Sequence, residues 1–472
     1  NASNMTLSNL NLSWTGTGQS GTGIQMGDSS SNTISGVNAS HRGVGAYLTG
    51  ASGGNTFSGD DFSGCLWGVH QPDGTGQGNV YRGNNLSNAS AYAMLISGDK
   101  TPVIEGNDFT NAANGIWWRG VSGASLSGLD LSPYKITGTA LQLNNASNMT
   151  LSNLNLSWTG TGQSGLGLDV FASNGVAAAG LQITARGVGV HLSGGNQVAI
   201  RGSQIRGNVT GLLAENGSAG VGVSGNVFSG NTQYAVRNAA ASPIDAVDNF
   251  WGSATGPRSA SNPAGTGDVV SDLVSFAPFL TVDPFDTTPP TVLVSSPAAN
   301  AAGWYNADVT VSFRGEDAGS GIASCSAPVT FTTDGANQSA TGSCTDKAGN
   351  TASVTVTGIN IDKTGPTVLI SSPTANVAGW YNTDVTVSFS GADSGSGIAF
   401  CSAPVTLNTD GAKQSAMGSC TDKAGNTGSA TLTRINIDKA GPTVLVSSPA
   451  GGVFIAHRDT LAVAFSVSDA LD

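Results

Sequence analysis

The amino-acid sequence predicts an all-β protein in two parts, a parallel β-solenoid followed by a string of antiparallel β-sandwiches. One repeat of roughly two dozen residues runs through the N-terminal half, and a second, longer repeat begins near Pro289-Pro290. Charged residues make up only 10% of the 472-residue chain, while Gly, Ser, Thr and Asn are abundant. This composition suits turn-rich β-structure and disfavours helices.

The first repeat is clearest at Asn55–Gly64, where two apolar residues stand five positions apart between polar, glycine-ended turns. The residue before the second apolar position recurs at an interval that stays close to two dozen residues. These residues are Asn11, Asn38, Asp61, Asn85, Asp108, Asp130, Asn155, Gln182, Gln204, Val227 and Asp248. Short alternating strands at such a period predict stacked coils, each paired with the next at about 4.8 Å. We therefore expect about 11 coils within residues 1–285.

The pattern resembles the right-handed parallel β-helix repeat family, which is broadly pectate-lyase-like. The segment Asp248–Gly252 with Gly256-Pro257, followed by residues 274–280, is similar to the way many such bacterial domains end. The resemblance implies a right-handed parallel β-helix over residues 1–285. It indicates no single activity, because this architecture hosts lyases, hydrolases, adhesins and structural proteins alike.

The C-terminal half carries the second repeat, which opens three times with one motif, at Pro290–Pro297, Pro366–Pro373 and Pro442–Pro449. Alternating apolar and polar residues between frequent turn signals predict small antiparallel β-sandwiches. They resemble the bacterial Ig-like domains found in tandem on secreted and surface proteins. We assign residues 286–365 and 366–441 to two such domains and residues 442–472 to the start of a third. Because this third copy stops early, we interpret the chain as an internal piece of a longer polypeptide.

Four of the five cysteines form matching pairs in this second repeat. Cys325 and Cys344 lie in the first copy and Cys401 and Cys420 in the second, with the same spacing between the members of each pair. Zinc is the competing interpretation, but no Cys-x-x-Cys motif and no nearby His supports it, so we predict one disulfide per domain. Disulfides indicate an oxidising compartment, here extracellular or on the cell surface. The remaining Cys65 is expected to be a small buried residue of the solenoid.

One outward-facing column of the solenoid supplies candidate binding residues. Side chains alternate between the two faces of a strand, so the residue after each inward Ile, Val or Leu points outward. The expected column reads Gln25, Tyr47, His70, Leu95, Trp117, Gln142, Asp169, His191, Leu213 and Arg237. Aromatic rings on a rigid face suit the apolar faces of sugars, so Tyr47, His70 and Trp117, with Arg119 close by, form a predicted carbohydrate-binding site. The alternative is that these rings contact a neighbouring chain.

Catalysis on this architecture requires clustered carboxylates and a base. Asp108 and Asp130 are expected to be neighbours, whereas Asn85 separates Asp61 from Asp108. The asparagines in the same column indicate turn bonding and side-chain ladders instead. The polygalacturonase-like combination of Asp pairs, Gly-His-Gly and Arg-Ile-Lys is absent from the sequence. We therefore assign no catalytic residue, and the sequence favours a non-enzymatic role.

Calcium is the only cofactor for which the sequence offers candidates. Asp317, Asp346 and Asp362 recur at the equivalent positions of the next copy, as Asp393, Asp422 and Asp438. Hard cations take several oxygen ligands, so these carboxylates are candidates for Ca²⁺ at domain junctions. The alternative is structural, with Asp346 opening a hairpin turn and Asp362 ending a strand.

Charge and hydropathy exclude two classes of partner. The net charge is −12, and residues 1–288 carry 10 basic against 16 acidic side chains, so no basic patch for nucleic acid or anionic membrane is expected. No apolar run is long enough to span a bilayer. The preferred function is an extracellular structural or adhesive repeat protein, such as a segment of a surface fibre, sheath or adhesin, whose partners are glycans or copies of itself. The alternative is a carbohydrate-active β-helix enzyme or a polysaccharide-binding module with Ig-like spacers.

Overall fold

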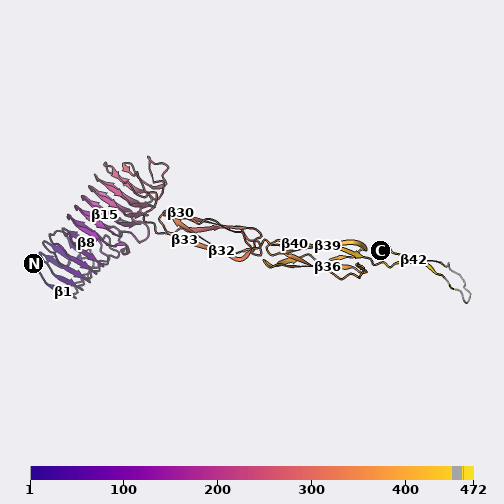
Figure 1. Ribbon diagram of the computed structural model, residues 1–472. Helices are drawn as coiled ribbons and strands as arrows, with labels where there is room; N and C mark the ends of the chain where they lie inside the picture. The colour runs from indigo at the N-terminus through magenta and orange to yellow at the C-terminus, as the bar shows by residue number, and fades with distance from the viewer. Residues whose placement is uncertain (1, 449–459, 461, 472) are drawn as a thin grey trace. The chain divides into compact units, whose positions relative to one another are not determined.

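The computed structural model describes residues 2–448, 460 and 462–471, and in that part of the chain it contains strands, turns and one short 3-10 helix but no α-helix. The chain divides into two compact units, Asn1–Thr288 with Ala318–Gly321, and Pro289–Asp317 with Ile322–Asp472. Figure 1 shows both units with their strands labelled. Among the described residues, no helical segment has the length and apolar character needed to cross a bilayer.

The first unit is a parallel β-solenoid built around one ten-stranded sheet. Its strands follow one another in chain order, every pair is parallel, and each coil contributes one strand. The strands are β2 (Thr22–Gly27), β4 (Val44–Thr49), β6 (Trp67–Gln71), β8 (Tyr92–Ser97), β10 (Ile116–Arg119), β12 (Thr139–Asn144), β14 (Leu166–Phe171), β17 (Val188–Ser193), β20 (Thr210–Glu215) and β23 (Tyr234–Asn238). The all-β solenoid is therefore confirmed, with about ten turns instead of the eleven that the sequence predicts.

Smaller parallel sheets complete the coils. A five-stranded sheet contains β1 (Thr6–Ser8), β3 (Thr33–Ser35), β5 (Thr56–Ser58), β7 (Val80–Arg82) and β9 (Val103–Glu105). A seven-stranded sheet contains β11 (Ser125–Ser127), β13 (Thr150–Ser152), β15 (Ala177–Ala179), β18 (Ala199–Arg201), β21 (Gly222–Ser224), β24 (Ile244–Asp245) and β27 (Val274–Ser275). The remaining sheets join β16 (Gln182–Thr184), β19 (Gln204–Arg206) and β22 (Val227–Ser229), and β25 (Pro257–Arg258) with β26 (Gly267–Val269).

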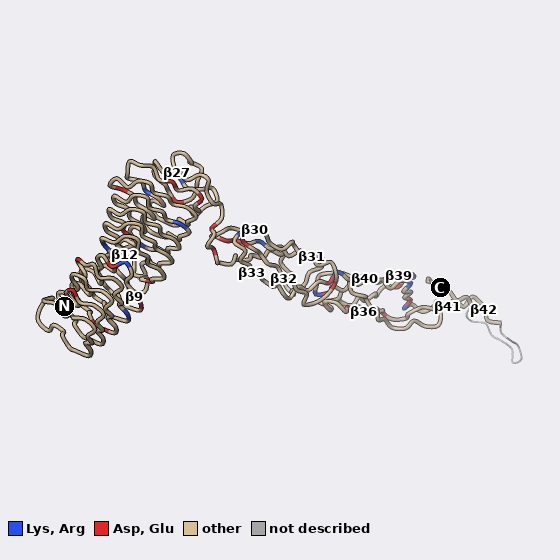
Figure 2. Tube along the Cα trace, turned by 60° about the vertical axis from the view of Figure 1, so that its left-hand side comes forward, with Lys and Arg blue, Asp and Glu red and all other residues tan. Residues whose placement is uncertain are grey.

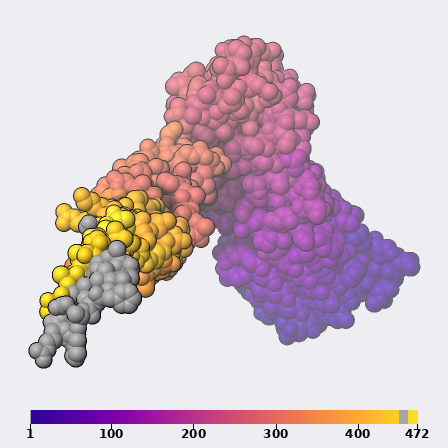
Figure 3. Space-filling view, turned by 90° about the vertical axis from the view of Figure 1, so that its right-hand side faces the viewer, coloured from indigo at the N-terminus to yellow at the C-terminus, as the bar shows by residue number. Residues whose placement is uncertain are grey.

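Strand alternation separates the core from the outer face of the ten-stranded sheet. On β10, Ile116 and Trp118 are fully buried, whereas Trp117 and Arg119 between and after them are half-buried. Parallel register stacks Ile116 on Leu141 of the next coil, which extends one apolar column along the axis. Cys65 belongs to this core as a buried free thiol, as predicted. In Figure 3 the solenoid surface changes gradually from indigo to salmon, as expected when coils adjacent in sequence are adjacent in space.

The polar turns use asparagine and aspartate in two distinct ways. Asp61 and Asp108 each accept a hydrogen bond from the backbone N–H two residues ahead, at 3.0 and 2.8 Å, which confirms the predicted turn bonding. The ladder between coils is made one residue earlier than expected. Buried Asn84 accepts a bond from the backbone N–H of Asp60 at 2.9 Å and donates to Asn107 at 2.9 Å.

The stacking is interrupted on one side, between coils that were expected to be continuous. Strand β9 ends one sheet and β11 begins another, and no bridge joins Asp108 to Asp130 in the described part of the chain. A 3-10 turn, Ser132–Tyr134, lies in the following segment, and the ring of Tyr134 packs 5.6 Å from that of Phe109. A cavity of about 440 Å³ occupies the gap. The expectation that Asp108 and Asp130 are ladder neighbours is therefore wrong.

The second unit contains two similar modules, each with two sheets whose strands pair antiparallel, except that β35 (Trp380–Tyr381) pairs with β40 (Thr427–Ile437) in parallel. In the first module, β28 (Thr291–Ser295), β29 (Val309–Glu316) and β31 (Val329–Phe331) face β30 (Ile322–Cys325), β32 (Gly335–Asp346) and β33 (Thr351–Ile361). In the second, β34 (Thr367–Ser371), β36 (Val385–Ala392) and β38 (Val405–Leu407) face β35, β40, β39 (Gly411–Asp422) and β37 (Ile398–Cys401). Strands β41 (Thr443–Ser448) and β42 (Ala464–Ser468) pair antiparallel, and residues 449–459, 461 and 472 of the expected third copy lie outside the described residues.

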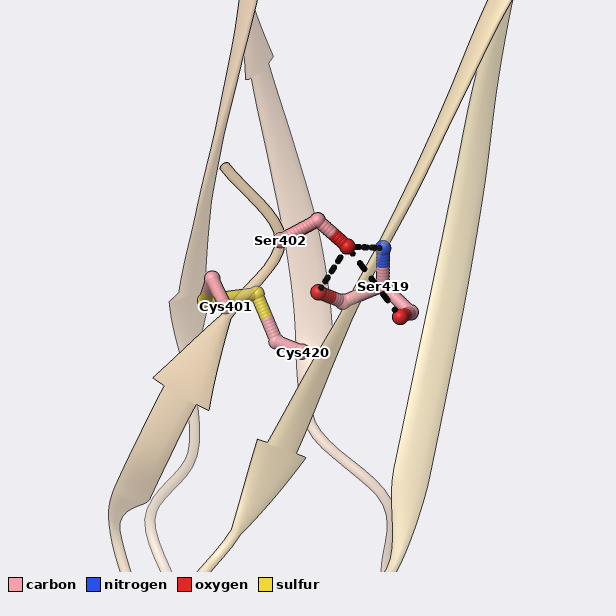
Figure 4. The surroundings of a disulfide bond; sticks show 4 residues. All are labelled: Cys401, Ser402, Ser419 and Cys420. Carbon is pink, nitrogen blue, oxygen red and sulfur yellow. Dashed lines mark hydrogen bonds between the residues drawn. A yellow bond between two sulfur atoms is a disulfide. The ribbon is translucent and has the colours of Figure 1, made fainter. Parts of the chain in front are cut away.

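Each module contains the predicted disulfide. Cys325 bonds to Cys344 and Cys401 to Cys420, and in both cases the two cysteines are directly opposite on paired antiparallel strands. Figure 4 shows the second bond, beside which the hydroxyl of Ser402 accepts a hydrogen bond from the backbone N–H of Ser419 at 2.9 Å.

Lys, Arg, Asp and Glu residues are sparse along both units, as the coloured positions of Figure 2 show. Blue and red positions are both scattered along the solenoid.

Candidate functional site

The outward column of the ten-stranded sheet has the register that the sequence predicts. Tyr47 pairs with His70, His70 with Leu95, Leu95 with Trp117, and Trp117 with Gln142. The column then continues through Asp169, His191, Leu213 and Arg237. From β4 to β20, every strand of the column pairs with a neighbouring strand on both sides.

Five rings gather at the N-terminal end of this face, and we call them the aromatic patch: Tyr47, Trp67, His70, Tyr92 and Trp117. Trp67 is central, with its ring stacked 4.7 Å from His70 and 5.6 Å from Tyr92. Trp117 lies 6.3 Å from Trp67 and 5.3 Å from Tyr92. Tyr47 meets His70 edge to face at 5.3 Å. All five rings are half-buried, so one part of each packs on the sheet and another part faces solvent.

Arg119 borders the aromatic patch. Its guanidinium lies 5.8 Å from the centre of the Trp117 ring, a distance typical of a cation–π contact. The indole Nε1–H of Trp117 is enclosed and has no hydrogen-bond partner among the described residues. The structure thus brings together Tyr47, His70, Trp117 and Arg119, and it adds Trp67 and Tyr92, which the sequence analysis did not select.

A hydrogen-bonded chain of polar side chains continues from the patch, and we call Gln142, Asp169, His191 and Glu215 the polar row. Gln142 Nε2 donates to Asp169 Oδ2 at 2.9 Å, and the side-chain carbonyl of Gln142 accepts from the hydroxyl of Tyr92 at 2.8 Å. The ring nitrogens of His191 lie 2.9 Å from Asp169 Oδ1 and 3.3 Å from Glu215 Oε1. A carboxylate oxygen lies beside each ring nitrogen, an arrangement that favours the protonated form, in which both nitrogens donate.

The two histidines of the outward column are expected to titrate in opposite directions. The hydrogen bond to Asp169 raises the pKa of His191 above its ordinary value, although burial lowers it. Burial lowers the pKa of His70, and the nearby Arg119 lowers it further against the effect of Asp73. NMR titration of the imidazole resonances should therefore show His191 deprotonating at higher pH than His70. Asp169→Asn should lower only the His191 midpoint, and coincident midpoints in the unmodified protein would contradict the geometry.

Three carboxylates meet where the two modules of the second unit join. Asp362, Asp393 and Asp422 place oxygens within 4.8 Å of one another, an arrangement that could hold a metal ion. Burial alone would raise the pKa of Asp362, but hydrogen bonds from the side chain and backbone of Ser396 and the backbone of Thr364 hold it below its usual range. The structure thus separates the predicted set, because Asp362 joins residues of the second module. Asp346, which begins a hairpin turn closed at Asn350, lies with Asp317 in another group of carboxylates that could hold a metal ion. Calcium binding stays a prediction.

The carboxylates considered for catalysis have structural roles. Asp61 and Asp108 are turn residues two coils apart in the bridged ladder, with Asn85 between them. Arg119 belongs instead to the ten-stranded sheet and lies against Trp117.

The match to a known protein family concerns the solenoid. A family model described as the right handed beta helix region matches residues 1–131 and 114–249, more than half of the chain. The chain belongs to this right-handed β-helix family. No curated protein matches the chain.

Three solved structures are among those that resemble this β-helix protein. The A-module of the Azotobacter vinelandii mannuronan C-5 epimerase has a TM-score of 0.33 at 14% identity, covering 55% of this chain and 79% of its own. The receptor binding domain of the Siphovirus 9NA tailspike has a TM-score of 0.23 at 10% identity, and the match covers 79% of this chain and 73% of the tailspike chain. The tailspike protein gp49 from Pseudomonas phage LKA1 has a TM-score of 0.25 at 9% identity, and the match covers 88% of this chain and 66% of the gp49 chain. Likenesses of this size carry no information on function.

Proposed function

We propose that this β-helix protein is an extracellular, non-enzymatic adhesive or structural repeat protein that binds a glycan on its aromatic patch. One observation carries the proposal: five rings in mutual contact stand half-exposed on a parallel sheet. A sugar ring has an apolar face of C–H groups, which gains free energy when it leaves water against an aromatic ring. The rings are already ordered, so binding costs little conformational entropy.

The surroundings of the patch favour binding over chemistry. Arg119 lies against the ring of Trp117, and the carboxylate of Asp169 is already engaged by Gln142 and His191. The two disulfides are typical of an oxidising compartment. We propose that the two disulfide-bonded modules are Ig-like sandwiches that serve as spacers. A second copy of this chain is the competing occupant of the patch.

Binding should depend on Trp67 and Trp117. A glycan array identifies ligands, and titration of the best hit monitored by tryptophan fluorescence gives the affinity. We expect Trp67→Ala and Trp117→Ala each to weaken binding about tenfold, the loss expected when one stacking contact worth roughly 1.4 kcal/mol disappears.

Trp14→Ala is the matched control, because Trp14 is an exposed indole in the first loop that lies outside the ten-stranded sheet. Its affinity should equal that of the unmodified protein. Unchanged affinity in the Trp67 and Trp117 variants would refute the proposed site. Concentration-dependent dimerisation that Trp67→Ala abolishes, without glycan binding, would assign the patch to a second copy.

A further inference from the structure

The regular bonding between coils is lost at one step, between β9 and β11, and we call this gap the slot. In the coil before it, the backbone N–H of Gly83 donates to the carbonyl of Glu105 at 2.9 Å. In the coil after it, the equivalent Gly128 donates to Ser152 at 3.0 Å. Gly106 holds the same position at the slot but makes no backbone bond to the following coil, and no sheet pairing joins β9 to β11 in the described part of the chain.

Two side chains explain why the interruption occurs here. The fully buried indole of Trp118 donates to the backbone carbonyl of Asp99, just before β9, at 2.9 Å. The asparagine ladder ends at Asn107, which accepts bonds from the backbone and side chain of Asn84. The next coil has Leu129 at this position, which has no amide to continue the ladder. The slot is therefore a property of the sequence at these coils.

Backbone edges of the two strands face each other across the slot. On β9, the N–H of Val103 donates back to the preceding coil at 2.9 Å, so by alternation those of Ile104 and Gly106 point toward the slot. On β11, the N–H groups of Ser125 and Ser127 point back toward it, since their register partners on β13 donate back to the coil of β11. Each strand thus presents an edge without a partner strand. Unpaired strand edges are templates for an added strand.

The slot has the space and the lining that a short strand requires. Its cavity of about 440 Å³ is far larger than the roughly 15 Å³ that a single water needs. The lining residues Gly106, Ser127 and Gly128 are exposed, so the slot is open to solvent. Ile104 and Leu129 also line it and are partly buried. Because side chains alternate along a strand, an inserted strand could cover these two residues with one apolar side chain and keep its neighbours in solvent.

The charge at the slot favours a basic residue in such a strand. Glu105 and Asp130 line the cavity, whereas none of its described lining residues is Lys or Arg. Glu105 is already paired with Arg82 at 2.8 Å. Asp130 is exposed, and the described part of the chain offers it no ion pair. A cation placed beside Asp130 would therefore gain a charge-assisted hydrogen bond.

We propose that the slot binds an extended peptide of a partner protein, which pairs with β9 and β11 together. The peptide carries one apolar side chain toward Ile104 and Leu129, and a Lys or Arg toward Asp130. In strand addition of this kind, main-chain hydrogen bonds supply affinity, and contacts of alternate side chains supply specificity. The inference does not depend on the glycan-binding function, since β9 and β11 belong to other sheets than the aromatic patch.

The probe is a fluorescein-labelled peptide with the sequence of residues 196–204 of this chain, added to the whole protein. Its central residues, Ala199–Arg201, form β18, which pairs in parallel on both sides within the solenoid and supplies an apolar Ile200 followed by a basic Arg201. We expect fluorescence anisotropy to show binding. Methylation of the peptide nitrogens of Ala199 and Ile200 removes one N–H on each side of the strand, so binding should weaken about tenfold.

Variants of the protein place the bound peptide. Ser127→Pro removes one N–H that faces the slot and should weaken binding about tenfold, whereas Ser127→Ala keeps that N–H and is the matched control. Asp130→Asn should weaken binding about threefold, and it keeps the oxygen that accepts from the backbone N–H of Ser132. In the unmodified protein, hydrogen exchange at the amides of Ile104 and Gly106 should slow when the peptide is bound, a measurement that requires no variant to fold.

Absence of peptide binding would overturn the proposal, as would equal binding of the N-methylated peptide. Binding that Ser127→Pro leaves unchanged, with unchanged exchange at Ile104 and Gly106, would place the peptide on another surface and overturn it as well. Slower exchange at these amides as the concentration of the protein alone rises would assign the slot to a second copy of this chain instead of a partner peptide.

Discussion

Replacing Cys325 and Cys344 by alanine is expected to lower the free energy of unfolding of the first module of the second unit by about 3 kcal/mol, the value that loop-closure entropy gives for a loop of about 20 residues. The loss is large for this module because its buried apolar core contains only six residues, Val309, Val311, Phe313, Ala340, Ile359 and Ile361. A small core leaves a narrow margin of stability, and a crosslink that restricts the unfolded chain then contributes a large share of it.

Calorimetry with and without reductant measures this effect. Reduction of the unmodified protein should shift the transitions of both modules to lower temperature and leave that of the solenoid, whose Cys65 is free and buried, unchanged. A variant in which all four paired cysteines are alanine is the control, because reductant should have no further effect on it. If the unfolding temperatures of the modules in the unmodified protein did not change with reductant, the disulfides would not have the stabilising role expected here.

Asp60→Asn is expected to stabilise the solenoid at neutral pH. Asp60 is 1% exposed, and its Oδ2 has no hydrogen-bond partner among the described residues. Burial raises its pKa to about 6 although the backbone of Val37 donates to the carboxylate. An asparagine keeps the acceptor and supplies an amide donor, as Asn84 does toward the backbone carbonyl of Phe57 at 3.1 Å.

The direction in which stability changes with pH follows from the raised pKa of Asp60. The folded state binds the Asp60 proton more tightly than the unfolded state does, so the stability of the unmodified protein falls as pH rises from about 4 to about 6 and stays low above that. Asp60→Asn removes the charge, so the gain should be on the order of 2 kcal/mol at pH 8, after allowance for solvent screening, and close to zero at pH 4.

Asn84→Asp is the reverse control, because Asn84 occupies the next position of the same ladder. It should destabilise the solenoid at pH 8, with a smaller loss at pH 4. Calorimetric midpoints of the solenoid transition at the two pH values check both variants. A gain from Asp60→Asn that is equal at pH 4 and pH 8 would show that the buried charge is not its cause.

The sequence predicts the solenoid well because its signals are local. Polar turns at a steady period and strict strand alternation place Ile116 and Trp118 inside and Trp117 outside, as the structure shows. The ladder was assigned one residue too late because Asn and Asp both bond turns and bond between coils, and composition does not separate the two roles. The interruption after β9 depends on how Tyr134 packs against Phe109, a tertiary contact with no periodic signature.

The candidate site was predicted in part for the same reason. Alternation from inward residues found the column of Tyr47, His70 and Trp117, but Trp67 and Tyr92 stand at the start of their strands, where the sequence shows no alternation yet. Their shared register, in which Trp67 pairs with Tyr92, was the missing signal. Glu215 was missed because it ends β20, and its contact with His191 depends on side-chain direction across two strands.

The central claim is that the aromatic patch binds a glycan, and a crystal structure of the protein with the best array hit tests it most directly. We expect sugar density over Trp67 and Trp117, with pyranose faces against the indole rings. Sugar bound on another surface, or a patch covered by a second copy of the chain while the glycan is present, would contradict the account.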